Sequence, residues 1–308
     1  MQRLSREHFS HVFDRHRPAV LKVVPGEKFL VETEDSRSGQ CRTPETTTPE
    51  YLLALRAKGP YYGNPVTGPV FIEGTSPGDT LAVHIHEVRC DTLGYMGYWP
   101  SIYHLQDWLP KPVTHFVEIR DGFVWFDLTT ASGVHSLKIP VRPMIGCIGT
   151  APDLEVLSGG RAGRYGGNLD TPEVAAGSTV YLPVGVDGGL LYLGDCHPYQ
   201  GDGEVSGCEM RADVVLSVEV LKDGSMADQQ FPRVETAENL VTVGAGCPAE
   251  LAQWQAIREM MRWLCKRHGW TREDARTFLA MVGDLRPGQL QSGDYTMRMI
   301  VPKSYLPQ

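Results

Sequence analysis

Residues 80–88 read TLAVHIHEV, a stretch in which apolar and polar side chains alternate clearly. Alternation with a period of two is typical of a β-strand that buries one of its faces. One face would hold Leu81, Val83, Ile85 and Glu87, and the other Ala82, His84, His86 and Val88. Two histidines on one face could bind a metal ion, but half-exposed strands often carry polar residues on their wet side. We therefore interpret His84 and His86 as part of a solvated face.

Short runs rich in β-branched and aromatic residues surround this strand, from Ala19 to about Met210, and Gly, Pro and Asp separate them. They are FLVET (29–33), GPVFIEG (68–74), HFVEI (115–119), FVWFDL (123–128), VHSLKIPV (134–141), TVYLPV (179–184) and LLYLGD (190–195). Short strands at such spacing indicate an antiparallel sandwich or barrel rather than a βαβ array. The sequence therefore predicts a mostly β fold.

The C-terminal third changes to helical periodicity. Residues 248–270 place apolar side chains at helical spacing: Leu251, Trp254, Ile257, Met261, Leu264 and Cys265. Gly269 stands where a helix would end, and Thr271 with Asp274 resembles the cap of a second helix that runs to about Gly283. A last strand near 295–302 returns the chain to a sheet. We expect one domain over 1–308, with a β-rich part at 19–225 and a helix-rich segment at 245–290 packed on it.

Composition limits the classes of partner. The 308-residue chain has 42% hydrophobic residues and a net charge of −8, so it can bury a large core but offers no basic surface for nucleic acid. No stretch approaches the ~20 apolar residues of a membrane span. Residues 1–10 are polar and lack the apolar run of a secretory signal, so we expect no secretion, and the seven cysteines form no CxxC pair. We expect reduced thiols, a cytoplasmic location and a small, neutral partner.

Residues 193–208 read LGDCHPYQGDGEVSGC, a mixture that neither a core strand nor a surface turn requires. If 192–197 form a strand, Asp195 and His197 share a face and one metal ion could bind both. The Gly201-Asp202-Gly203 segment is typical of a turn, which would bring Glu204 back towards the same place. This motif is the strongest indication of an enzyme.

Two further segments offer polar groups. RAGRYGGNLDTP (161–172) places Asn168 and Asp170 two residues apart, although both are also common turn formers. Residues 34–40 follow a strand and contribute Asp35, with a solvated loop as the simpler interpretation. The aromatic stretch 95–108 shows little periodicity and is predicted to be a rim loop that binds substrate or another subunit.

Five blocks occur in the order found in one family: residues 64–85, 139–152, 166–174, 192–207 and 283–290. The chain resembles the acetamidase/formamidase family through them. The resemblance implies a jelly-roll-like β-sandwich with two or more C-terminal packing helices, assembled as a homodimer or higher homo-oligomer. It also implies hydrolysis of the C–N bond of a small neutral amide by a site that binds a divalent metal, with zinc favoured.

The family segments G-D-x-H, Q-G-D-G-E and G-G-N-x-D correspond to residues 194–197, 200–204 and 166–170. The sequence departs from the family at Pro198-Tyr199, at Ser36-Arg37-Ser38 and in the aromatic run 94–112. These departures concern the substrate more than the chemistry.

An unactivated amide resists water, and a metal with an open position polarises its carbonyl and lowers the pKa of bound water. The expected ligands are Asp170, Asp195 and His197. Nitrogen and oxygen donors suit zinc, whereas an all-oxygen set suits calcium. The remaining candidates are the catalytic carboxylates Glu204, Asp35 and Asp202 and the substrate-binding residues Asn168, Gln200, Trp99 and Tyr103.

Two alternatives stay open. Cys196 could act as a nucleophile with His197 as its base, but neighbours on a strand point to opposite faces. A non-catalytic β-sandwich stabilised by metal, such as calcium in its Asp/Gly-rich turns, could instead bind a small ligand or a partner.

Overall fold

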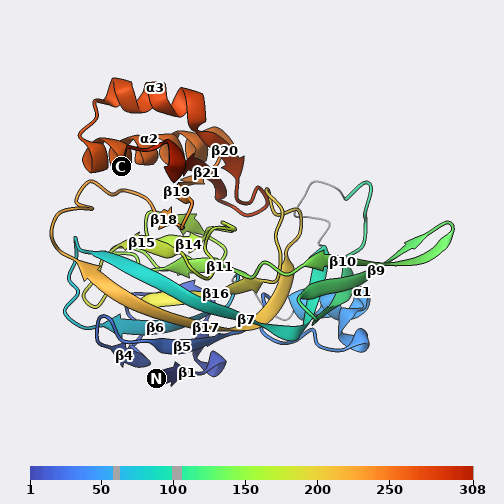
Figure 1. The fold of residues 1–308 in the computed structure, drawn as a ribbon. Coiled ribbons are helices and arrows are strands. Elements are labelled where there is room, and N and C mark those ends of the chain that lie inside the picture. Colours follow the sequence, from blue (N-terminus) through green and yellow to red (C-terminus); the bar gives the residue numbers. More distant parts are fainter. Residues whose placement is uncertain (58–62, 99–105, 308) are drawn as a thin grey trace.

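The computed structural model describes residues 1–57, 63–98 and 106–307, and most of its strands join one curled sheet (Figure 1). A separate pair joins β3 (Val12–Phe13) to β12 (Leu157–Ser158). Within the described ranges the strand pairs are antiparallel, apart from β1 with β5 and β4 with β6. The predicted mostly β, antiparallel fold is confirmed.

The first strands of the large sheet are β1 (Gln2–Leu4), β2 (Phe9–Ser10), β4 (Leu21–Val23), β5 (Phe29–Thr33), β6 (Val66–Ile72), β7 (Thr80–Tyr98), β8 (Val113–Arg120), β9 (Phe123–Thr130), β10 (Gly133–Pro140) and β11 (Met144–Gly149). The others are β13 (Ala162–Gly163), β14 (Gly166–Asn168), β15 (Thr179–Pro183), β16 (Leu191–His197), β17 (Cys208–Leu221), β18 (Arg233–Glu235), β19 (Asn239–Gly246), β20 (Asp284–Pro287) and β21 (Tyr295–Pro302). The α-helices are α1 (Pro49–Ala57), α2 (Ala249–His268) and α3 (Arg272–Val282), and the 3-10 turns are η1 (Arg6–His8), η2 (Pro44–Thr47) and η3 (Lys303–Tyr305).

Strand β7 contains a bulge opposite β17. Ile85 pairs with Leu216 and Glu87 with Val215, so His86 is the extra residue. The side chains after it change faces, and Val88 is buried while Glu87 is exposed. The expectation that Glu87 shares a face with Ile85 was therefore wrong.

The two histidines of β7 contact hydroxyl groups on neighbouring strands. His84 Nδ1 lies 2.9 Å from Thr179 Oγ1, and His86 Nε2 lies 2.8 Å from Ser217 Oγ. Both histidines belong to a polar strand face, as the sequence indicated.

Strand β7 also extends into the expected aromatic loop. It continues to Tyr98, paired with β8 and β17, and Tyr95 is 2% exposed. A loop beginning at Tyr95 was therefore incorrect. Ladder pairing on both sides of the strand outweighs the weak local periodicity, and Gly94 leaves room for the close approach of β17.

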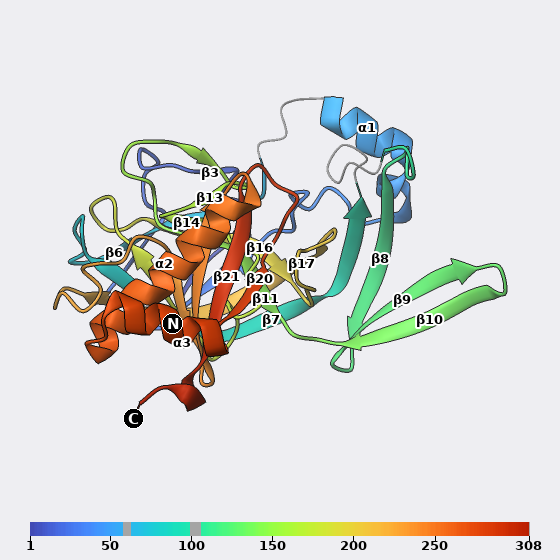
Figure 2. The same ribbon diagram turned by 90° about the horizontal axis from the view of Figure 1, so that it is seen from above.

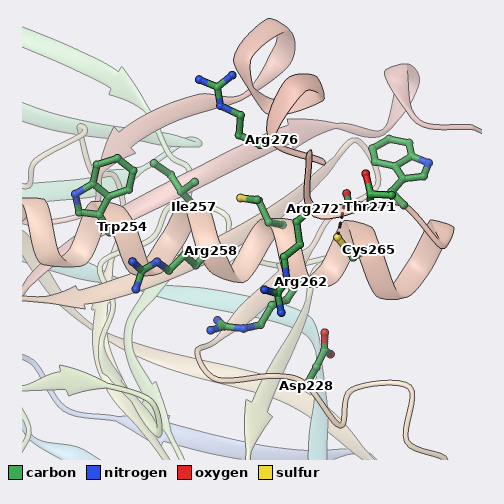
Figure 3. A pocket seen from close by; sticks show the side chains of 11 residues that line it. Asp228, Trp254, Ile257, Arg258, Arg262, Cys265, Thr271, Arg272 and Arg276 are labelled. Atoms are coloured by element: carbon green, nitrogen blue, oxygen red, sulfur yellow. Dashed lines mark hydrogen bonds between the residues drawn. The ribbon is translucent and has the colours of Figure 1, made fainter. Parts of the chain in front are cut away.

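Helix α2 packs on β19 and β21 through a face that coincides only in part with the expected stripe. Leu264 of that stripe is buried, and Ile257, Met261 and Cys265 are partly buried. Its buried residues are Ala252, Ala256, Glu259, Met260, Trp263 and Leu264. A Cβ at Gly244 of β19 would collide with the Ala252 carbonyl and Ala256, so small residues allow the helix to lie close to the sheet. Of the expected stripe, Leu251 and Trp254 are about half exposed, and Figure 3 shows Trp254, Ile257 and Cys265 along a surface groove.

The hairpin β9–β10 projects away from the rest of the fold (Figure 2). β9 pairs with β8 only over Phe123–Trp125, so both edges of the outer hairpin are unpaired within the described residues. No helix in the described ranges is both long and apolar enough to cross a bilayer.

A buried ion pair attaches α2 to the sheet. Arg233 and Glu259 are both fully buried, and the Arg233 Nη2–Glu259 Oε1 distance is 2.7 Å. Arg262 and the backbone N–H of Gln230 also donate to Glu259. The Glu259 carboxylate therefore neutralises the positive charge of Arg233, whose guanidinium is inaccessible to water.

We predict that Glu259→Ala lowers the free energy of unfolding by about 3–5 kcal/mol, because it leaves the buried charge of Arg233 without its main partner. The exposed Glu250→Ala, at the first turn of the same helix, should cost less than ~1 kcal/mol. Denaturant unfolding measures both values. Equal costs would show that the buried pair does not stabilise this contact.

Candidate active site

Four carboxylates and a histidine from separate segments meet inside the curled sheet. β16 supplies Asp195 and His197, and the segment after β14 supplies Asp170. The turn after β16 supplies Glu204, and the start of β17 supplies Glu209. All five residues are at most 9% exposed. The structure thus brings together four of the residues expected from the sequence and adds Glu209.

Backbone conformations that are unusual for non-glycine residues orient three of these acids. Asp170, Asp195 and Glu204 have φ values of 44°, 55° and 43°. Such positions cost on the order of 1–3 kcal/mol each and concentrate at functional sites. A Cβ at Gly146 would lie 2.7 Å from Asp170 Oδ1 and 3.0 Å from Asp195 Oδ2, so glycine there makes room for both carboxylates.

Several polar atoms of this cluster point at one another without hydrogen bonds. His197 Nε2 lies 3.7 Å from Asp195 Oδ1 and 3.6 Å from Glu209 Oε2. Both Asp170 oxygens, together with those three atoms, are buried and have no hydrogen-bond partner among the described residues. One donor atom from each of Asp170, Asp195 and His197 falls within 4.8 Å of the others. Because buried polar groups are ordinarily bonded, this arrangement fits a cation between them.

Mutual repulsion in the cluster appears as shifted pKa values. Burial, followed by the charge of Asp195, raises the pKa of Asp170 to about 8 and that of Glu209 to about 7. Burial and the charge of Asp170 raise the pKa of Glu204 well above its usual range. Burial opposes a charge on His197, but Glu209 and Asp195 together raise its pKa. One imidazolium cannot neutralise four carboxylates, so a bound cation would relieve the repulsion.

Amide side chains hold the cluster in place. Gln200 Oε1 lies 2.9 Å from His197 Nδ1, and Gln200 Nε2 donates to the Asp170 carbonyl at 2.7 Å. When the ring is neutral and Nδ1 carries the proton, the Nε2 lone pair of His197 faces the carboxylates. Asn64 Nδ2 donates to Asp195 Oδ2 at 2.5 Å. The amide of Gln200, which we expected to bind substrate, contacts His197 and Asp170. Gln200 also lines a cavity next to the cluster, and its role in substrate binding stays a prediction.

Two expected catalytic acids lie outside the cluster. Asp35 is fully buried, and its Oδ1 accepts from the backbone N–H groups of Arg37 at 3.0 Å and Gly39 at 3.1 Å, which fixes the loop after β5. The Asp202 side chain is 39% exposed and forms an ion pair with Arg298.

Of the other expected substrate-binding residues, one lies beside the cluster. Trp99 and Tyr103 lie outside the described residues. Asn168 is buried beside the cluster, and its Oδ1 accepts from Asn64 Nδ2 at 2.9 Å.

Sequence reasoning missed Glu209, which follows the quoted motif directly. The alternation of Glu209, Arg211 and Asp213 at the start of β17 was the available signal, since such residues share one strand face. Asn64 was quoted only as the first residue of a block, and no spacing linked it to Asp195.

Cys196 lies on the same strand as His197 but in a different environment. It is fully buried, and Thr33 Oγ1 donates to its Sγ at 3.5 Å. Burial raises the pKa of this thiol to about 12. A nucleophilic cysteine requires a thiolate, so these surroundings disfavour the thiol mechanism.

A cavity of about 210 Å³ opens onto the cluster. Its lining includes Asp195, Glu204, Glu209, Asn168, Asn64, Ser36, Arg37 and Tyr95. The groove of Figure 3 is larger, about 950 Å³, but α2 and the start of α3 form most of its wall and none of the clustered carboxylates lines it. The smaller cavity is therefore the candidate active site.

Comparison with known proteins agrees with this architecture. The chain is 26% identical to a formamidase of Methylophilus methylotrophus over 260 residues, which are 67% of this chain and 62% of that protein. The chain thus spans about six tenths of the length of the curated relatives it matches. An acetamidase structure from Bacillus halodurans is 32% identical, with a TM-score of 0.87 and 98% of each chain covered.

An acetamidase structure from Yersinia enterocolitica is 27% identical and has a TM-score of 0.86, covering 100% of this chain and 93% of that one. The family model of the acetamidase/formamidase family matches residues 3–164 and 159–284. With most of its length matched, the chain belongs to the acetamidase/formamidase family.

Proposed function

We propose that this protein is a metal-dependent amidohydrolase that converts a small amide to a carboxylate and ammonia. The observation that carries the proposal is the set of buried, unbonded donor atoms on Asp170, Asp195 and His197 beside a small cavity. The formamidase and acetamidase names of its relatives support the same chemistry.

Asp170, Asp195 and His197 would hold the cation, and their mixed oxygen and nitrogen donors favour zinc over calcium. When bound, such an ion polarises the amide carbonyl and lowers the pKa of a coordinated water. Gln200 maintains the histidine in the required orientation, and Asn64 orients Asp195. Such supporting bonds commonly affect metal affinity 10- to 100-fold.

Glu204 is the proposed proton carrier. It lies at the junction of the 210 Å³ cavity and a neighbouring one of about 240 Å³, so it borders the space available to substrate and water. Its raised pKa suits a group that takes a proton from the attacking water and delivers it to the leaving nitrogen. Glu209, which can share a cation with His197 and Glu204, would add a further negative charge beside that cation.

We also infer a cytoplasmic, homo-oligomeric protein with a small amide as its partner. The free state of all seven cysteines supports a reducing compartment. The unpaired edges of the β9–β10 hairpin support assembly, because exposed strand edges favour pairing with another chain.

Purified without chelator, the protein should contain about one tightly bound divalent ion per chain. His197→Ala should lose this ion and the amidase activity, since it removes the nitrogen donor. His84→Ala, which alters a strand histidine bonded to Thr179, should retain both. Elemental analysis and ammonia release measure the outcome, and full activity without stoichiometric metal would contradict the proposal.

Glu204→Gln should lower kcat by about 10²-fold while retaining the metal, because glutamine keeps the shape but cannot carry the proton. Asp202→Asn is the matched control, since Asp202 lies in the same turn but pairs with Arg298. Equal loss in both variants, or an unchanged kcat for Glu204→Gln, would remove Glu204 from this role. A metal-bound wild type that hydrolyses no amide would favour the ligand-binding alternative.

A further inference from the structure

Arg37 places a buried positive charge in the wall of the candidate active site. The residue is 9% exposed and lines the 210 Å³ cavity together with Asp195, Glu204 and Glu209. We propose that Arg37 binds a carboxylate on the acyl side of the substrate, a proposal that rests on the proposed amidase function. The substrate class is then the half-amide of a short dicarboxylic acid.

The guanidinium of Arg37 contacts a hydroxyl, an aromatic ring and a thiol, and none of these neighbours is a carboxylate. Arg37 Nη1 donates to Thr114 Oγ1 at 2.8 Å, and its Cζ lies 4.6 Å from the centroid of the Tyr95 ring. The Cys41 thiol is a further neighbour. Among residues 1–57, 63–98 and 106–307, no carboxylate forms a salt bridge with this guanidinium, and residues 58–62, 99–105 and 308 include no Asp or Glu.

A buried charge is ordinarily paired, because transfer from water is costly without a counter-charge. Arginine offers five N–H donors in a fork that matches a carboxylate. Thr114 and Cys41 leave part of that fork available. An anionic group of the ligand is therefore the missing partner.

The local structure fixes the position of this guanidinium. The backbone N–H of Arg37 is bonded to Asp35 Oδ1, and the left-handed residues Ser38 and Gly39 close the turn. Nη2 lies against Gly97, at the place that a Cβ of a larger residue would occupy. Arg37 is thus held by the chain on several sides.

Groups of opposite charge line the same cavity, since Arg37 is among its lining residues together with Glu204 and Glu209. Gly97 is bonded through its carbonyl to Ser206, next to Gly207, where a Cβ would contact Glu204 and Glu209. The guanidinium and the carboxylate cluster therefore border one short cavity. Its volume equals that of about seven water molecules at ~30 Å³ each, enough for a short chain with an amide at one end and a carboxylate at the other.

The test compares succinamate and malonamate with butanamide and the neutral diamide succinamide, using wild type, Arg37→Gln, Arg37→Lys and the control Arg89→Gln. Arg89 is exposed on β7 and does not line the cavity.

The wild type should prefer the half-amides by at least about tenfold in kcat/KM. Arg37→Gln should lower kcat/KM for the half-amides about 10- to 100-fold more than it lowers kcat/KM for butanamide. Arg37→Lys should recover part of this loss, and Arg89→Gln should match the wild type.

A wild-type preference for butanamide or succinamide, or an equal loss for both classes in Arg37→Gln, would overturn the proposal and leave Arg37 with a structural role. Calorimetry with succinate provides a readout without turnover: wild type should bind it, and Arg37→Gln should not. If no amide is hydrolysed, the proposed amidase function fails. Loss of succinate binding in Arg37→Gln would still support the anion site, and unchanged binding would refute it.

Discussion

The burial of several carboxylates around one histidine is the constraint on which the site depends. Burial disfavours the charged form of each acid, and like charges at such short separation repel. Burial first, and the neighbouring carboxylates second, raise the pKa values of Asp170, Glu204 and Glu209. The fold nevertheless forces the groups together from β16, β17 and the segments beside them. The inward-facing atoms that have no hydrogen-bond partner support the proposed cation between these groups.

The sheet withstands this cost because the surrounding backbone is closely packed and firmly paired. Strand β16 pairs with β6, β11 and β17, so its polar residues lie among fully buried neighbours. Gly146 admits the Asp170 and Asp195 carboxylates where any larger residue would collide with them. The unusual backbone of Asp195 is maintained by these pairings, which explains how one residue can leave the strand conformation within a strand.

Much of the site and the positions of the C-terminal helices were predictable from local sequence patterns. The features that the sequence did not reveal have physical reasons. Two-residue spacing predicted that Asp195 and His197 lie together, and they do, although Asp195 departs from the strand conformation on which the prediction relied. Capping signals located α2 and α3 closely. Non-local contacts decide what the pattern did not reveal: Glu209 reaches the cluster through sheet pairing, and the inward face of α2 follows from Gly244 and the Arg233–Glu259 pair. The bulge at His86 likewise arises from pairing with β17, which no property of TLAVHIHEV reports.

The most direct test of the proposed metal site is anomalous X-ray diffraction from crystals of active protein grown without chelator. With data collected on both sides of the zinc absorption edge, the account predicts one strong peak about 2.0–2.2 Å from His197 Nε2 and from oxygens of Asp170 and Asp195. Crystals of fully active protein with no anomalous peak at this cluster at any first-row metal edge, or with the peak at His84 and His86 instead, would contradict it.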